Sequence, residues 1–164
     1  MADQEEERAG MTETEMRSNV LRLVFGGNEE LFDAFRGAIE AVLPPDAAAV
    51  IRGSSVTGRR HSDDAPFDDD GPGTSDVDLT LVGSTVLDWF TEDGFYIPAV
   101  HSKPLSDEHP DIAPALVPLR RKLSALVARP VHIQATRDFA MFVKEVLLGQ
   151  PYLTIVGKIE SETA

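Results

Sequence analysis

Hydrophobic residues recur along the chain in two patterns, the spacing of a helix and the alternation of a strand. A helical apolar face begins after Asn28, which is a good N-cap, and runs to the stop at Pro44-Pro45. Its apolar positions are Leu31, Phe32, Phe35, Ala38, Ile39, Val42 and Leu43. Residues 48–51 are a short apolar run, which predicts a buried strand entering a tight turn at Arg52-Gly53.

The remaining elements follow from the same two patterns. Strands are predicted at 76–82, 131–136 and 152–156, and helices at 85–90, from Pro118 to Val127 and at 139–148. In the first of these strands Val77, Leu79 and Leu81 share one face. This order of elements predicts an α/β (α+β) fold, a small mixed sheet covered by helices.

A chain of 164 residues is long enough for one domain with a sizeable core. We assign residues 17–164 to that domain. Residues 1–16 are acidic and lack apolar periodicity, which predicts a disordered tail or a weak leading helix. Residues 58–75 are rich in Gly and Asp and predict a long acidic loop, and a loop of such length is usually functional or disordered.

Charge and composition narrow the classes of partner. The formal net charge is −13, which disfavours nucleic-acid binding through a broad basic surface. There are no cysteines, so thiolate chemistry and disulfides are excluded. No apolar run approaches the length of a membrane span, and the first ten residues do not resemble a secretory signal. We therefore expect a cytoplasmic protein that does not contact membranes.

The residues with the clearest chemistry are Asp76 and Asp78. Two positions apart on a strand, their carboxylates leave the same face about 7 Å apart. Carboxylates held side by side repel one another, and protonation or a divalent cation relieves that repulsion. Oxygen ligands of this kind suit Mg²⁺ or Mn²⁺.

A second group of residues stands at the end of the preceding strand. Glycine in the turn Gly53-Ser54-Ser55 lets the backbone approach a ligand closely, and the following N–H groups and hydroxyls can hold phosphate oxygens. Arg52, Arg59 and Arg60 lie near this turn in sequence. They would either contact phosphate or pair with the acidic loop.

Together, the Gly53-Ser54 turn and the Ser75-Asp76-Val77-Asp78-Leu79 strand resemble the polymerase-beta-type nucleotidyltransferase superfamily. The resemblance covers residues 28–136. It implies a small nucleotidyltransferase that moves a nucleoside monophosphate from a triphosphate to a hydroxyl, with Mg²⁺ as cofactor. Asp76 and Asp78 would then be the catalytic metal ligands, and Gly53, Ser54, Ser55 and Ser75 would bind the nucleotide.

Two departures from the family pattern leave alternatives open. Gly53 and Asp76 stand further apart than is usual in the family, because acidic residues arrive in an insertion. The strand at 131–136 has no carboxylate where a third metal ligand is expected. His132 and Gln134 share its outward face and are the neutral substitutes, and we expect Gln134 to be the third ligand.

A neutral amide cannot accept a proton from the acceptor hydroxyl, so a second reading is a catalytically impaired protein that acts by binding a nucleotide or another protein. A third reading is an interaction module whose acidic surface meets a basic partner. For the enzyme, we expect a protein or small-molecule acceptor rather than nucleic acid. No second substrate-binding domain is visible, so long loops, a partner protein or a homo-oligomer would complete the acceptor site.

Overall fold

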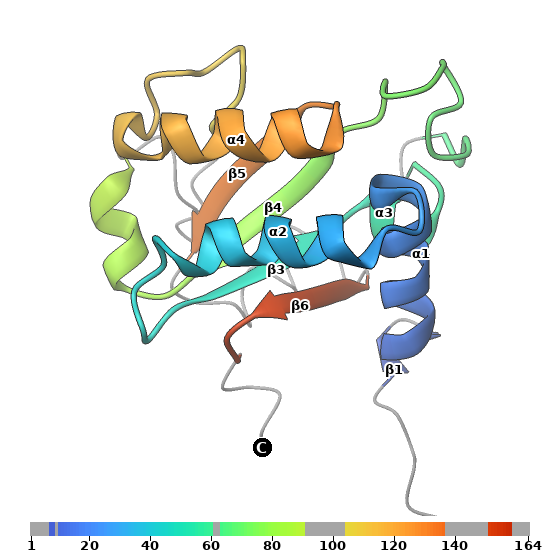
Figure 1. Cartoon of the computed structure of the whole chain (residues 1–164), viewed down its shortest axis with the longest axis horizontal. Helices are drawn as coiled ribbons and strands as arrows, with labels where there is room; N and C mark the ends of the chain where they lie inside the picture. Colours follow the sequence, from blue (N-terminus) through green and yellow to red (C-terminus); the bar gives the residue numbers. More distant parts are fainter. Residues whose placement is uncertain (1–6, 9, 61–62, 91–103, 137–150, 159–164) are drawn as a thin grey trace, which may run out of the picture.

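Four strands form one mixed sheet in the computed structural model of the chain, and helices α2 and α4 lie across one face of it (Figure 1). The strands are β3 (Ala48–Arg52), β4 (Val77–Val82), β5 (Val131–Thr136) and β6 (Tyr152–Val156), in the order β5-β4-β3-β6. The structure describes residues 7–8, 10–60, 63–90, 104–136 and 151–158. The expected α/β fold with a small mixed sheet is confirmed.

The pairing of the strands decides which side chains meet. β3 is antiparallel to both β4 and β6, whereas β4 and β5 are parallel. The parallel register sets Asp78 beside His132, and Thr80 beside Gln134. The antiparallel register sets Arg52 on the other side of Asp78.

Of the two alternatives for the leading segment, a tail or a helix, the described residues show a helix at its end. Two short strands, β1 (Glu7–Arg8) and β2 (Met11–Thr12), pair with each other, and helix α1 (Glu13–Phe25) follows. Residues 13–16, expected in an acidic tail, therefore form the first turn of a helix, and Met16 is fully buried. A capping box between Thr12 and Glu15 starts this helix. The prediction rested on apolar spacing, which residues before Met16 lack, and did not use the capping residues.

Helix α2 (Glu29–Glu40) begins as expected, because the Asn28 side chain accepts a hydrogen bond from Leu31 N. It ends earlier than the apolar pattern suggested. The residue before a proline is disfavoured in the helical conformation, so Leu43 cannot extend the helix into Pro44. Val42, expected on the buried face, is consequently 43% exposed.

The other helical elements are short except for α4. They are α3 (Ser54–Thr57), η1 (Thr85–Trp89), η3 (Pro114–Leu116) and α4 (Val117–Val127). The helix expected at 139–148 lies outside the described residues. None of the helices in the described part of the chain has both the length and the apolar character that a membrane span needs.

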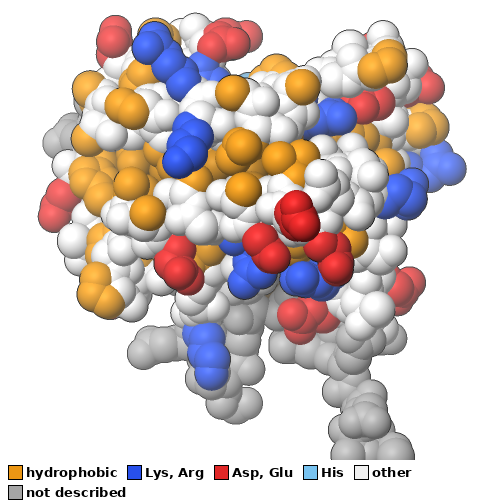
Figure 2. Space-filling model, in the orientation of Figure 1, with side chains coloured by type: hydrophobic (Ala, Val, Ile, Leu, Met, Phe, Trp, Pro, Cys, Tyr) orange, Lys and Arg blue, Asp and Glu red, His pale blue; other side chains and the backbone are white. Residues whose placement is uncertain are grey.

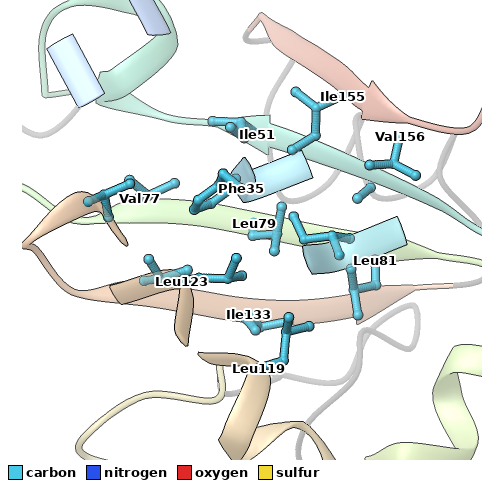
Figure 3. Packing of buried hydrophobic residues seen from close by; sticks show 14 of the residues in the cluster. Phe35, Ile51, Val77, Leu79, Leu81, Leu119, Leu123, Ile133, Ile155 and Val156 are labelled. Carbon is cyan, nitrogen blue, oxygen red and sulfur yellow. The ribbon is translucent and has the colours of Figure 1, made fainter. Parts of the chain in front are cut away.

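The core lies between the sheet and the helices (Figure 3). Alternation along β4 turns Val77, Leu79 and Leu81 toward the helices, where they join Phe35 of α2 and Leu123 of α4. Burial of these apolar surfaces, at about 25 cal/mol per Å², is the main stabilising term of the fold. The opposite face of β4 carries the polar side chains of Asp78 and Thr80.

The acidic loop is held in place by arginines. Arg60 pairs with Asp63 and Asp70, and Arg59 lies 3.9 Å from Asp64. Two of the three arginines near the Gly53 turn, Arg59 and Arg60, thus pair with the acidic loop, which was one of the two expected outcomes. Arg52 instead donates to Thr80 and Gln134. The ion pairs of the loop are all at the surface, where such contacts contribute little stability.

A stronger tie joins the end of the loop to the turn between α4 and β5. The buried Arg129 guanidinium donates to both carboxylate oxygens of Asp68, at 2.7 and 3.0 Å. Asp68 also accepts from the N–H groups of Gly73 and Ser75, and the Arg129 guanidinium stacks on the Phe67 ring. This network fixes the chain just before it enters Asp76.

Asp68→Asn tests the network. The hydrogen bond from Arg129 lowers the pKa of Asp68 from 3.8 to about 2. Since the folded pKa lies below the unfolded one, the stabilisation is complete above about pH 4 and is lost as the pH falls through about 2. We expect the variant to lose about 2 kcal/mol or more of unfolding free energy at pH 7, measured by urea unfolding.

The difference between wild type and variant should shrink as the pH approaches 2. Asp33→Asn is the control, because Asp33 pairs with Arg36 at the exposed surface and should change stability by less than about 0.5 kcal/mol. A gap between wild type and Asp68→Asn that is the same at pH 7 and at pH 2 would contradict the assignment.

Candidate metal centre

Three side chains with metal-binding atoms meet on the face of the sheet that points away from α2 and α4. Asp76 immediately precedes β4, Asp78 lies within it, and the parallel register brings in His132 from β5. His132 Nδ1 lies 3.2 Å from Asp76 Oδ2 and 3.8 Å from Asp78 Oδ1. One ligand atom from each residue lies within 4.8 Å of the other two, so the cluster can bind a metal ion.

The electrostatics of Asp78 favour a bound cation. Burial raises the pKa of the Asp78 carboxyl, and the neighbouring Asp76 carboxylate raises it further. The Arg52 guanidinium and His132 oppose this shift. Two carboxylates held this close are unfavourable as a pair of anions, and a divalent cation between them removes the repulsion.

Arg52 also lies on the face of the sheet that carries the cluster. From the sequence alone, Arg52 was expected to contact either phosphate or the acidic loop. Its Nε donates to Thr80 Oγ1 at 3.3 Å, and its Nη2 donates to Gln134 Oε1. The guanidinium therefore lies along the middle of the sheet beside Asp78. Arg52 and Asp78 are separated in sequence by the whole acidic loop, so their proximity became apparent only from the antiparallel pairing of β3 with β4.

The expected third ligand, Gln134, lies two residues further along β5 than His132, opposite Thr80 rather than Asp78. Its amide oxygen already accepts the hydrogen bond from Arg52. Metal binding by Gln134 stays a prediction, while His132 occupies the place beside both carboxylates. The acidic loop adds no carboxylate to the cluster in the described part of the chain.

Gly53 lies directly against the cluster. Its backbone angles are φ 85° and ψ −155°, a region that only glycine adopts readily. A Cβ atom at this position would lie 2.9 Å from Asp78 Oδ2. The turn after β3 therefore lies directly against the Asp78 carboxylate on β4.

The three serines expected to bind a nucleotide differ in their surroundings. Ser54 is half-buried in the first turn of α3. Ser55 is fully buried, and its hydroxyl has no hydrogen-bond partner among the described residues. Ser75 Oγ accepts from Asp68 N at 2.8 Å, so this hydroxyl closes the loop. Nucleotide binding by these residues stays a prediction, and Ser75 has a structural role as well.

Gly53→Ala tests the contact between the turn and the cluster. We expect the added methyl group to displace Asp78, to lower the unfolding free energy by about 2 kcal/mol and to weaken Mn²⁺ binding at least about tenfold. Gly58→Ala is the matched control, because Gly58 has φ 83° at the other end of α3 and open space around a Cβ. Equal effects of both variants on Mn²⁺ binding, measured by calorimetry, would contradict the contact.

Searches for related proteins gave no match. No protein-family model, no curated protein and no solved structure is similar to this chain. The resemblance to the nucleotidyltransferases stays a prediction from the sequence, and the function has to be argued from the cluster itself.

Proposed function

We propose that the chain is a metal-dependent nucleotidyltransferase that binds a nucleoside triphosphate and transfers its monophosphate to a hydroxyl acceptor. The observation that carries the proposal is the meeting of Asp76, Asp78 and His132 directly beside the Gly53 turn. A pair of carboxylates next to a glycine turn is an arrangement that can hold a cation and a phosphate chain together.

The donor set suits a divalent cation. Asp76 and Asp78 supply hard oxygen ligands, which fit Mg²⁺, and the His132 nitrogen makes Mn²⁺ an equally suitable ion. When bound, the cation would neutralise charge on the triphosphate and on the leaving pyrophosphate. The Gly53 turn would bring backbone close to the phosphates.

Transfer also needs the acceptor hydroxyl to lose its proton. His132 would not take that proton while its Nδ1 ligates the cation, because the other ring nitrogen then carries a hydrogen. A cation held by Asp76 and Asp78 would instead make a hydroxyl bound to it more acidic. The net charge of −13 disfavours nucleic acid as the acceptor, so a protein or small-molecule hydroxyl is the proposed acceptor.

Binding without transfer is the second candidate. The observation that favours it is that an imidazole, His132, lies beside the two carboxylates where a third carboxylate is expected. A protein of this kind would bind the triphosphate with its cation but release no pyrophosphate.

Asp78→Ala tests the cation and nucleotide site. The four nucleoside triphosphates are titrated into the whole protein by calorimetry, with Mg²⁺, with Mn²⁺ and with EDTA. We expect one or more to bind only with a cation, and Asp78→Ala to weaken that binding at least about 100-fold, which is about 2.7 kcal/mol. The variant should stay folded, because the substitution removes a carboxylate whose burial is unfavourable.

Asp88→Ala is the control for this experiment, since Asp88 lies in η1 and is no member of the cluster. Binding in EDTA that equals binding with Mg²⁺, or an Asp78→Ala variant that unfolds, would contradict the proposed site.

His132→Asp separates transfer from binding. A carboxylate beside Asp76 and Asp78 should raise Mg²⁺-supported pyrophosphate release at least about tenfold, because it adds an anionic ligand and base. Gln134→Glu is the matched variant, which keeps an acceptor for Arg52. If Gln134→Glu raises pyrophosphate release and His132→Asp does not, position 134 is the place of the third ligand. If no variant releases pyrophosphate, the protein binds the triphosphate without transfer.

A further inference from the structure

Helix α4 and the turn after it carry a concentration of positive charge that the rest of this acidic protein lacks. Residues 117–129 contain four arginines and lysines and no acidic residue, in a chain with a net charge of −13. They are Arg120, Arg121, Lys122 and Arg129. Figure 2 shows Lys and Arg side chains gathered over α4, at the top of the view.

Three of these cations line one cavity. It has a volume of about 470 Å³ and lies between α4, the turn before β5 and the segment around Asp107. Its charged and polar lining consists of Asp107, Arg120, Arg121, Ser124 and Arg129. Lys122 lies on another face of the helix and lines a separate, largely apolar groove between α2 and α4.

Arg120 is a buried cation whose anionic partner is an exposed side chain. The residue is 8% exposed, and its Nη1 donates to the Val131 carbonyl at 3.3 Å. Its Nη2 donates to a carboxylate oxygen of Asp107, a side chain that is 85% exposed. The Asp107 carboxylate therefore takes a place that the anionic group of a ligand can take instead.

Three other residues that line the cavity have hydrogen-bond donors that an anion could use. Arg121 is exposed and has no ion-pair partner in the part of the chain that the structure describes. Arg129 Nε is buried without a hydrogen-bond partner among those residues, although the rest of that guanidinium is bound to Asp68 and Ser75. Ser124 Oγ accepts from Val131 N, so its hydroxyl hydrogen can still be donated.

We propose that this cavity binds the phosphate group of a small phosphorylated molecule, with Arg120 and Arg121 as its charged partners and with Asp107 displaced. The three arginines face two carboxylates, Asp68 and Asp107. Displacement of Asp107 leaves two net positive charges, which matches a phosphate dianion. Guanidinium groups from separate positions and a hydroxyl also suit an anion with several oxygens better than a carboxylate.

The volume points to an organic body attached to the phosphate. A cavity of this size is in the range of small-molecule sites and is larger than a phosphate ion needs. The remaining lining is apolar and consists of Pro110, Val117, Ala125 and Pro130. The cavity is distinct from the metal centre, because alternation along β5 turns Val131 toward α4 and His132 to the opposite face.

The test uses the whole protein in EDTA, so that the metal centre makes no contribution. Ribose 5-phosphate, inorganic phosphate and gluconate are titrated by calorimetry. We expect ribose 5-phosphate to bind most tightly and gluconate least. Arg121→Ala should weaken ribose 5-phosphate binding at least about tenfold, which corresponds to one charge-assisted hydrogen bond. Asp107→Ala should strengthen it several-fold by removing the competing carboxylate.

Lys122→Ala is the matched control, since Lys122 is the next residue on α4 but does not line the cavity. It should change the affinity less than about twofold. Equal weakening by Arg121→Ala and Lys122→Ala would overturn the proposal, because binding would then follow general charge. So would the absence of binding in EDTA, or gluconate binding as tight as that of ribose 5-phosphate. Failure of the metal centre to bind a nucleotide would leave all these results unchanged.

Discussion

The constraint on which the structure depends is the alternation of side chains along β4. One face of this strand supplies Val77, Leu79 and Leu81 to the core, and the other face presents Asp78 and Thr80. A shift of one residue would bury the carboxylates beneath the helices and expose the core. The apolar contacts with α2 and α4 therefore hold the acidic side chains on the opposite face, at an electrostatic cost that a bound cation would offset.

Arginines organise the polar parts of this acidic protein. Arg52 lies along the polar face of the sheet, Arg129 ties the acidic loop to the turn before β5, and Arg120 joins α4 to β5 and Asp107. Each guanidinium has several donors in a fixed plane and can bind a carboxylate and a carbonyl at once. The interior arginines thus connect segments that are distant in sequence, whereas the surface ion pairs of the loop join residues within the loop itself.

The two faces of β5 carry different chemistry. His132 joins the carboxylates on one face, and Val131 packs in the core on the other, where its carbonyl accepts from Arg120, a residue that lines the cavity. If both proposals hold, a cation with its triphosphate and a second phosphorylated molecule would bind on opposite sides of the same strand. A change in the position of β5 would then affect both sites, which is a physical route for one ligand to alter the affinity of the other.

The sequence by itself determined the elements that depend on local patterns. Alternation placed Asp76 and Asp78 on one face, and Asn28 and the apolar spacing placed the start of α2, because these features are settled by neighbours a few residues away. The leading helix could also have been found from its capping box. Its buried apolar residues Met16, Val20 and Val24 recur every four positions, but they cross the boundary drawn at residue 16.

Only the tertiary structure decided which distant residues meet. The register of β4 with β5 brought His132, rather than Gln134, beside the carboxylates, and the register of β3 brought Arg52. Strand register depends on the packing of whole faces against the core. A shift of two residues would keep the same side chains on each face, so the pattern along a single strand does not reveal which residue of β5 lies beside Asp78. The pairing of Arg129 with Asp68 likewise joins residues that no local pattern relates, because loop and turn meet only when the sheet has formed.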